Sequence, residues 1–140
     1  LGYTHCPDVC PFMLGNLAEV ETRMKERLDP AQQPQFVFIS VDPDRDTPAL
    51  LGEYVGFFSD DFRGMTGPKS EIDRVTEQLG AFYRLGVKDS DGDCGVDHSA
   101  EIYLIDPKGR LFGKFRPPLD PDDTAAKFES AQRFFEKTDT

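Results

Sequence analysis

Apolar side chains recur every three or four positions in four stretches of the chain, with charged residues between them. This spacing places the apolar residues on one face of an α-helix. The stretches predict helices over residues 11–28, 48–58, 68–82 and 121–136. Thr47 is a helix-capping residue type and Pro48 suits a first helical turn, so the second helix is expected to begin there. The expected inward faces are Phe12, Met13, Leu17, Val20, Met24 and Leu28 in the first helix, Ile72, Val75, Leu79 and Phe82 in the third, and Ala125, Phe128, Ala131, Phe134 and Phe135 in the last.

Shorter apolar runs between these stretches predict strands. Residues 36–41 are almost continuously apolar, which is typical of a strand buried on both faces, and residues 62–67 form a weaker candidate. Residues 98–105 alternate as a strand, residues 106–109 form a tight turn, and residues 110–115 are expected to return as its hairpin partner. We interpret Leu1–Thr4 as the end of a strand that starts upstream, so we expect the chain to be part of a longer protein.

The predicted order is strand end, helix, strand, helix, strand, helix, hairpin and helix. A β-α-β unit that leads into an antiparallel hairpin and a closing helix is the plan of a thioredoxin-like fold. We therefore predict an α/β fold of one domain over residues 1–140, with a central mixed β-sheet flanked by helices. The junction of the first strand and the first helix then lies at the rim of the sheet.

The composition of the chain limits which classes of function are open to it. The formal net charge of -10 argues against nucleic acid as a partner, because phosphate binding needs a basic face. No apolar run approaches the roughly 18 to 20 residues of a membrane span. Three cysteines among 140 residues do not make a disulfide framework, so they point to chemistry rather than to architecture.

Two of the cysteines, Cys6 and Cys10, lie four positions apart at the predicted start of the first helix, and each is followed by a proline. Residues four apart share a helix face, and the positive end of a helix favours thiolate over thiol. Such a dithiol either exchanges electrons or holds a soft metal. Redox proteins of this fold mostly use a two-residue gap, whereas the three-residue gap here also lets both sulfurs bind one ion, with Cu(I) or Zn favoured over Mg or Ca.

His98 is the predicted third ligand. It begins a predicted strand after a loop rich in Gly and Asp, and the fold can bring that hairpin beside the first helix. Two thiolates and one imidazole suit three-coordinate Cu(I), and they suit Cu(II) with an added ligand. His5 is a weaker candidate, and Cys94 is either incidental or a third thiol near the site.

Several acidic residues have two open interpretations. Asp8 could tune the dithiol or a docking surface, and Asp97 could orient the imidazole of His98 or simply be exposed. The loop with Asp42, Asp44, Arg45 and Asp46 either carries functional groups or is a solvated loop that caps the next helix. The loop at 89–95 resembles half of a calcium-binding loop, but it lacks the flanking helices and the distal Glu, so we interpret it as an ordinary loop.

Three motifs together resemble those of the SCO/SenC family. They are GYTHCPDVCP at residues 2–11, SVDP with RDTP over residues 40–48, and VDHS followed by YLIDPKG over residues 96–109. The resemblance covers nearly the whole chain, although Cys94 is outside the family pattern. It implies a thioredoxin-like domain that binds copper through Cys6, Cys10 and His98 and delivers it to the binuclear copper site of cytochrome c oxidase. It also implies an N-terminal membrane anchor, and a location on the periplasmic side of the bacterial inner membrane or in the mitochondrial intermembrane space.

Two functions therefore compete. The first is a copper metallochaperone, whose partners are the copper-site subunit of cytochrome c oxidase and a further copper chaperone or a thiol–disulfide reductase. The second is a thiol–disulfide oxidoreductase, with Cys6 as nucleophile and Cys10 as resolving thiol. A peroxidase of the same fold is disfavoured, because the chain has no Trp and no Arg or Gln stands beside Cys6.

Overall fold

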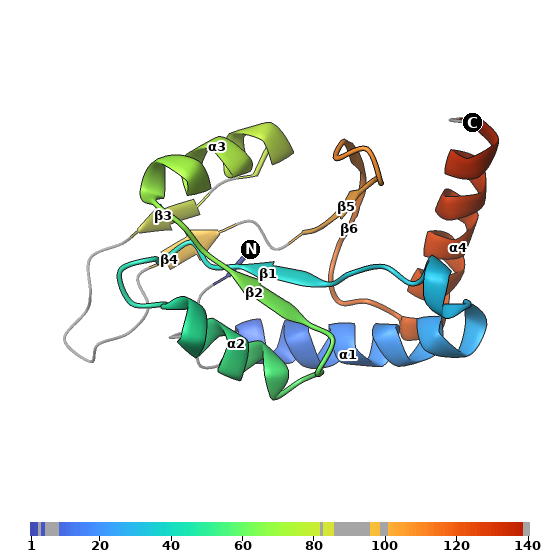
Figure 1. Cartoon of the computed structure of the whole chain (residues 1–140), viewed down its shortest axis with the longest axis horizontal. Coiled ribbons are helices and arrows are strands. Elements are labelled where there is room, and N and C mark those ends of the chain that lie inside the picture. Colours follow the sequence, from blue (N-terminus) through green and yellow to red (C-terminus); the bar gives the residue numbers. More distant parts are fainter. Residues whose placement is uncertain (3, 5–8, 82, 86–95, 99–100, 139–140) are drawn as a thin grey trace. The chain divides into compact units, whose positions relative to one another are not determined.

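The computed structural model describes residues 1–2, 4, 9–81, 83–85, 96–98 and 101–138 (Figure 1). The elements in chain order are α1 (Val9–Arg27), the 3-10 turn η1 (Pro30–Gln32), β1 (Val37–Ile39), α2 (Pro48–Gly56), β2 (Arg63–Met65), α3 (Lys69–Leu79), β3 (Tyr83–Leu85), β4 (Val96–His98), β5 (Ile102–Ile105), β6 (Leu111–Phe115) and α4 (Pro121–Thr138). All of the predicted helices are confirmed, to within a few residues at their ends.

The described strands pair two by two. β1 and β2 are parallel, with Phe38 opposite Gly64, whereas β3 and β4 are antiparallel, and so are β5 and β6. Parallel and antiparallel pairs are therefore both present among the described strands. A further parallel bridge joins Gly2 to Ser40, directly after β1.

The sequence interpretation was wrong about the strands between α3 and β5. It missed β3, and it treated residues 98–105 as one strand, whereas His98 ends β4 and Ile102 begins β5. The reason is tertiary, because the two halves of that alternating stretch serve different ladders. β4 pairs with β3, and β5 pairs with β6 (Figure 1).

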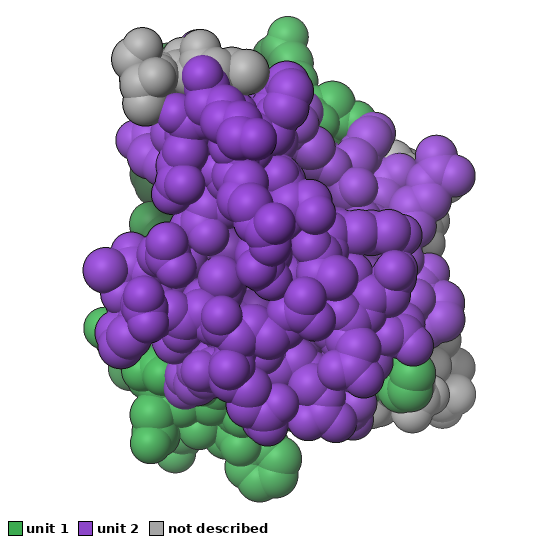
Figure 2. Space-filling model, turned by 90° about the vertical axis from the view of Figure 1, so that its right-hand side faces the viewer, with its two compact units in different colours: residues 1–14, 35–100 green, residues 15–34, 101–140 purple. Residues whose placement is uncertain are grey.

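The chain divides into two compact units, each built from two stretches of sequence (Figure 2). Unit 1 comprises residues 1–14 and 35–100, and unit 2 comprises residues 15–34 and 101–140. The prediction of a single domain stays a prediction.

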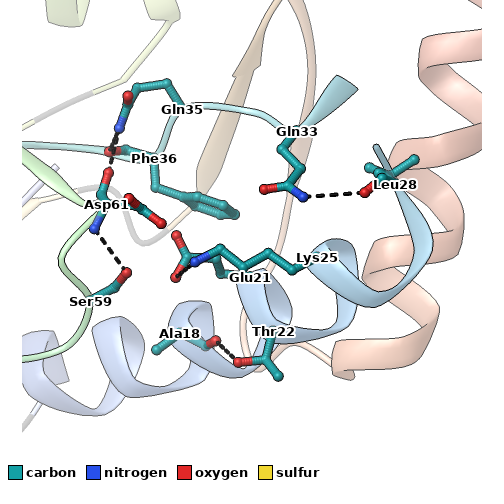
Figure 3. A network of polar contacts seen from close by, with 10 residues as sticks. All are labelled: Ala18, Glu21, Thr22, Lys25, Leu28, Gln33, Gln35, Phe36, Ser59 and Asp61. Atoms are coloured by element: carbon teal, nitrogen blue, oxygen red, sulfur yellow. Dashed lines mark hydrogen bonds and ion pairs between the residues drawn. The ribbon is translucent and has the colours of Figure 1, made fainter. Parts of the chain in front are cut away.

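In unit 1, the parallel β1–β2 pair lies beside α2. Buried apolar side chains from these elements and from α3 form the core of the unit: Phe38, Val41, Leu51, Val55, Phe62 and Ile72. Gly64 of β2 approaches α2 so closely that a Cβ there would lie 2.8 Å from the Cβ of Leu51. Just before β1 and β2, the Gln35 side-chain amide donates to the carbonyl of Asp61 (2.6 Å), and the Asp61 N–H donates to Ser59 Oγ (3.2 Å; Figure 3).

In unit 2, a side chain of α1 is clamped to the start of α4. The Asn16 amide donates to the carbonyl of Leu119 at 2.9 Å and accepts from the Leu119 N–H at 2.8 Å. Near the other end of α1, Arg27 Nε lies 3.1 Å from Glu129 Oε2, and Arg133 also pairs with Glu129. These two guanidinium groups, with Arg133 the stronger influence, lower the pKa of Glu129. Further polar contacts of unit 2 appear in Figure 3, where Lys25 Nζ lies 3.6 Å from Glu21 Oε1.

The β5–β6 hairpin of unit 2 turns on Asp106. Its carboxylate accepts from the main-chain N–H groups of Lys108 and Arg110, both at 2.9 Å, and from Arg110 Nε at 2.8 Å. Gly109 has φ +80°, in the left-handed region that glycine adopts without steric cost. Burial would raise the pKa of Asp106, but the hydrogen bonds from Arg110 and Lys108 outweigh burial and lower it.

Three apolar positions that we expected to be buried are exposed. Phe12 is 65% exposed because it lies two residues, or about 200° around the helix, from the buried Leu14. Val37 is 46% exposed, because it lies at the very start of β1, so this strand is not covered on both faces along its length. Phe134 is 60% exposed and instead contacts Phe112 edge-on, with ring centroids 6.3 Å apart.

Candidate metal centre

Two of the predicted ligands lie in unit 1, at the ends of two elements. Cys10 is the second residue of α1, and His98 is the last residue of β4, opposite Tyr83 of β3. Pro11 follows Cys10 in the first turn of α1, where its missing N–H costs no helical hydrogen bond. The start of a helix also presents main-chain N–H groups, which favour a negatively charged ligand such as a thiolate.

Other predicted site residues lie outside the described residues. They are Cys6, His5, Asp8 and Cys94. The side chains of Cys10, Asp97 and His98 also lie outside the described part of the chain, and the ligand set stays a prediction. Among the described residues, no three His, Cys, Asp or Glu side chains come together as a metal site, and this includes the acidic loop at 42–46.

The segment that leads into Cys6 is held beside β1. The Gly2 N–H donates to the carbonyl of Ile39 (3.0 Å), and the Val41 N–H donates to the carbonyl of Gly2 (2.9 Å). This pairing agrees with the prediction that residues 1–4 end a strand. Since α1 then begins at Val9, the dithiol segment joins the carboxyl end of a strand to the start of a helix.

A buried carboxylate anchors this segment a second time. Asp46 has no exposed surface, and its Oδ2 accepts from the main-chain N–H of Thr4 at 3.0 Å and from the Ser40 hydroxyl at 2.5 Å. Its Oδ1 accepts from the hydroxyl of Thr4. Ser40, also fully buried, accepts in turn from the N–H of Asp42 at 3.1 Å. We call Thr4, Ser40 and Asp46 the Asp46 cluster.

The loop between β1 and α2 contradicts one of the two interpretations of residues 42–46, that of a solvated capping loop. Asp42 is buried and pairs with Arg45, and Asp46 is buried in the cluster, so the loop is not simply solvated. Capping of α2 falls instead to Thr47, whose hydroxyl accepts from the Leu50 N–H at 3.2 Å, as predicted. The two aspartates hold the loop and the N-terminal segment together.

Sequence reasoning missed the Asp46 cluster, although one signal was available. Ser40 is a polar residue inside the apolar run at 36–41, and a buried hydroxyl needs a hydrogen-bonding partner. A carboxylate six residues later was a candidate partner. Its further contact to Thr4, 42 positions away, depends on tertiary structure.

The described elements comprise helices and paired strands, and the segment with Cys6 and Cys10 leads into α1. Two solved structures resemble this fold across nearly the whole chain. Bradyrhizobium japonicum ScoI with copper bound is 38% identical, with a TM-score of 0.79 over 93% of this chain and 80% of that one. Arabidopsis thaliana ScoI with copper bound is 34% identical, with a TM-score of 0.85 over 95% of this chain and 81% of that one. The predicted thioredoxin-like α/β fold is confirmed.

Sequence comparison then defines the family. Residues 1–133 match SCO1/SenC, and the chain belongs to this family. The human mitochondrial protein SCO1 homolog is 35% identical over 136 residues, which cover 97% of this chain and 45% of the human protein. The chain therefore spans less than half of that relative's length. In the part of the chain that the structure describes, no helix has the length and apolar character needed to cross a bilayer.

Proposed function

We propose that this chain is a copper metallochaperone, which binds copper through the thiolates of Cys6 and Cys10 and the imidazole of His98. The likeness to two copper-bound ScoI structures, at 38% and 34% identity, carries the proposal. The backbone supports it further, because Cys10 and His98 belong to the same compact unit and lie at the ends of α1 and β4.

The donor set fits copper as cargo. Soft thiolates and an imidazole bind Cu(I) well, and this set would accept Cu(II) with one added ligand. With three protein ligands the ion stays coordinatively unsaturated, so a thiolate of a docked partner can bind before the chaperone's ligands leave. Copper is then handed over by stepwise ligand exchange.

The proposed recipient is the copper-site subunit of cytochrome c oxidase, whose binuclear copper site would receive the ion. Another copper chaperone or a thiol–disulfide reductase would act upstream, by loading the site or by keeping its thiols reduced. The proposed location is the periplasmic side of the bacterial inner membrane, reached through an N-terminal anchor, with the mitochondrial intermembrane space as the alternative. The net charge of -10 favours a recipient with a basic docking face.

Copper stoichiometry and the absorption spectrum test the ligand set. The wild-type chain is expected to bind one copper and to show a thiolate-to-Cu(II) charge-transfer band. Cys6→Ala, Cys10→Ala and His98→Ala should each abolish the band or weaken copper binding strongly, as measured by competition with a chelator. The matched control is Cys94→Ala, which removes a thiol outside the proposed ligand set. Unchanged copper affinity in His98→Ala would refute its assignment as a ligand.

A thiol–disulfide oxidoreductase is the second candidate, and the position of Cys10 at the start of α1 favours it. In this reaction the Cys6 thiolate attacks a partner disulfide and releases one partner thiolate, which takes up a proton. The Cys10 thiolate then attacks the mixed disulfide and releases the second partner thiol. The partner is reduced by two electrons, the Cys6–Cys10 pair is oxidised to a disulfide, and a thiol reductant must restore it.

The two candidates differ in their need for His98. A metallochaperone requires the imidazole, whereas thiol–disulfide exchange requires the two thiols alone. The oxidoreductase is favoured if the wild-type chain reduces a protein disulfide catalytically and His98→Ala does so at the same rate. Loss of copper binding with negligible turnover would favour the chaperone.

A further inference from the structure

We propose that Asp46 is a positioning residue for the copper site, because its buried carboxylate holds Thr4 and with it the segment that carries Cys6. The inference rests on the proposed function. Asp46 follows β1 and precedes the cap of α2, 36 positions beyond Cys10 in the sequence, so the link to the dithiol segment exists through the fold alone.

The first step is the burial of the charge. A carboxylate with no exposed surface is stable in a fold when several donors replace its water. Asp46 has such donors in the Thr4 N–H (3.0 Å), the Thr4 hydroxyl and the Ser40 hydroxyl (2.5 Å). It also lies just before the positive end of α2, which favours an anion. Asp46 is therefore a strong and fixed acceptor.

The second step is the way in which Thr4 is held. Both its main chain and its side chain donate to the same carboxylate, so its position and its orientation are both restrained. Gly2, two residues earlier, is fixed by the bridge to the strand at Ile39 and Val41. Residues 2 and 4 are thus both hydrogen-bonded to residues 39–46, the end of β1 and the loop that follows it.

The third step is the distance to the proposed ligand. Two residues of chain span at most about 7 Å, so chain length alone keeps the Cα of residue 6 within about 7 Å of the Cα of Thr4. On the other side, Cys10 is fixed in the first turn of α1. A site that needs two sulfurs on one small ion is sensitive to such anchoring, because loss of an orienting hydrogen bond near a metal ligand costs about 10–100-fold in affinity.

The test compares Thr4→Val with Thr76→Val. Valine has the shape of threonine without the hydroxyl, so Thr4→Val removes the hydrogen bond to Asp46 and keeps the main-chain bond. The control, Thr76→Val, makes the same chemical change in unit 1, where the buried Thr76 hydroxyl donates to the carbonyl of Asp73 within α3 (2.9 Å). Thr4→Ser retains the hydroxyl and is the rescue variant. Asp46→Asn is used only in support of Thr4→Val, because a change at a fully buried charge can also prevent folding.

Cu(I) affinity is measured by chelator competition at a temperature where all variants are folded, and urea unfolding is measured alongside. Thr4→Val should bind Cu(I) about tenfold more weakly, at the low end of the range for lost orienting contacts. Thr4→Ser should bind within about twofold of wild type, and so should Thr76→Val, even where its urea midpoint falls. Wild-type affinity in Thr4→Val, or an equal loss in Thr76→Val, would overturn the inference.

A second measurement needs no copper. In a glutathione buffer the two thiols become a Cys6–Cys10 disulfide while glutathione disulfide is reduced to two glutathione molecules. A looser segment lowers the effective concentration of one thiol at the other, so Thr4→Val should lower this equilibrium constant several-fold, and Thr76→Val should leave it unchanged. If the wild-type chain fails to bind copper, the proposed function fails, and the glutathione result alone decides whether Asp46 positions the dithiol segment.

Discussion

Gly64→Ala tests how tightly the scaffold of unit 1 is packed. Gly64 lies in β2, opposite Phe38 of β1, and faces α2. A Cβ added there would lie 2.8 Å from the Cβ of Leu51 and 3.1 Å from the carbonyl carbon and oxygen of Leu51. Leu51 has no exposed surface, and two of the three close atoms belong to backbone, so relief requires α2 and β2 to move apart.

The close contact between an added Cβ at Gly64 and Leu51 sets the expected loss in the free energy of unfolding. Overpacking a well-filled core costs about 1–3 kcal/mol, while the loss of a glycine gives back about 0.4–1 kcal/mol by restricting the unfolded chain. We expect a net loss of about 1.5 kcal/mol in the free energy of unfolding. This loss lowers the urea midpoint by about 1 M and the melting temperature by about 5 °C.

The matched control is the same substitution at Gly52. This residue lies in α2, it is exposed, and a Cβ there meets nothing within 4 Å. Alanine is the better helix former by about 1 kcal/mol, so Gly52→Ala should stabilise the chain. Urea unfolding of both variants, followed by circular dichroism, measures the two effects. A Gly64→Ala protein as stable as wild type would refute the close packing of β2 on α2.

Two further predictions concern unit 2. The lowered pKa of Asp106 means that folding favours its ionised form, so its contribution to stability is present at neutral pH and is lost as the pH falls below the ordinary value of 3.8. The urea midpoints at pH 6 and pH 3 should therefore differ less in Asp106→Asn than in wild type. An equal difference in the two proteins would contradict this role of Asp106. Asn16→Ala removes both hydrogen bonds to the main chain of Leu119 and should lower the free energy of unfolding by about 2 kcal/mol. The control, Thr22→Ala, removes an exposed hydroxyl bonded within α1 and should lower it much less. Equal urea midpoints for the two variants would contradict the role of Asn16 in holding Leu119.

Much of the local structure could be predicted from residue spacing. The helices follow from apolar periodicity, and the start of α2 follows from Thr47 and Pro48, because these signals act between near neighbours in the sequence. The hairpin turn at Asp106 and Gly109 is equally local. In contrast, the strand β3 was missed, and its partner β4 was merged with β5, because three-residue strands are defined by pairing rather than by pattern.

The candidate site can also be predicted only in part from the sequence. Paired cysteines beside prolines at a helix start, with a distant histidine, indicate a soft-metal or redox site whatever the tertiary fold, because the chemistry belongs to the side chains themselves. The use of Asp46 could not be predicted in this way. Its sequence context leaves open a functional group or a solvated, helix-capping loop, whereas its burial with Thr4 and Ser40 makes it an anchor.

The sequence by itself thus determined the helices, the turn between β5 and β6 and the chemical character of the dithiol segment, since these depend on residue type and short spacing. Tertiary structure alone decided that β3 pairs with β4, which carboxylates are buried and what holds the segment before Cys6. The physical reason is that a buried charge is tolerated only where donors from distant parts of the chain converge on it. For Asp46, that convergence joins residues 4, 40 and 46.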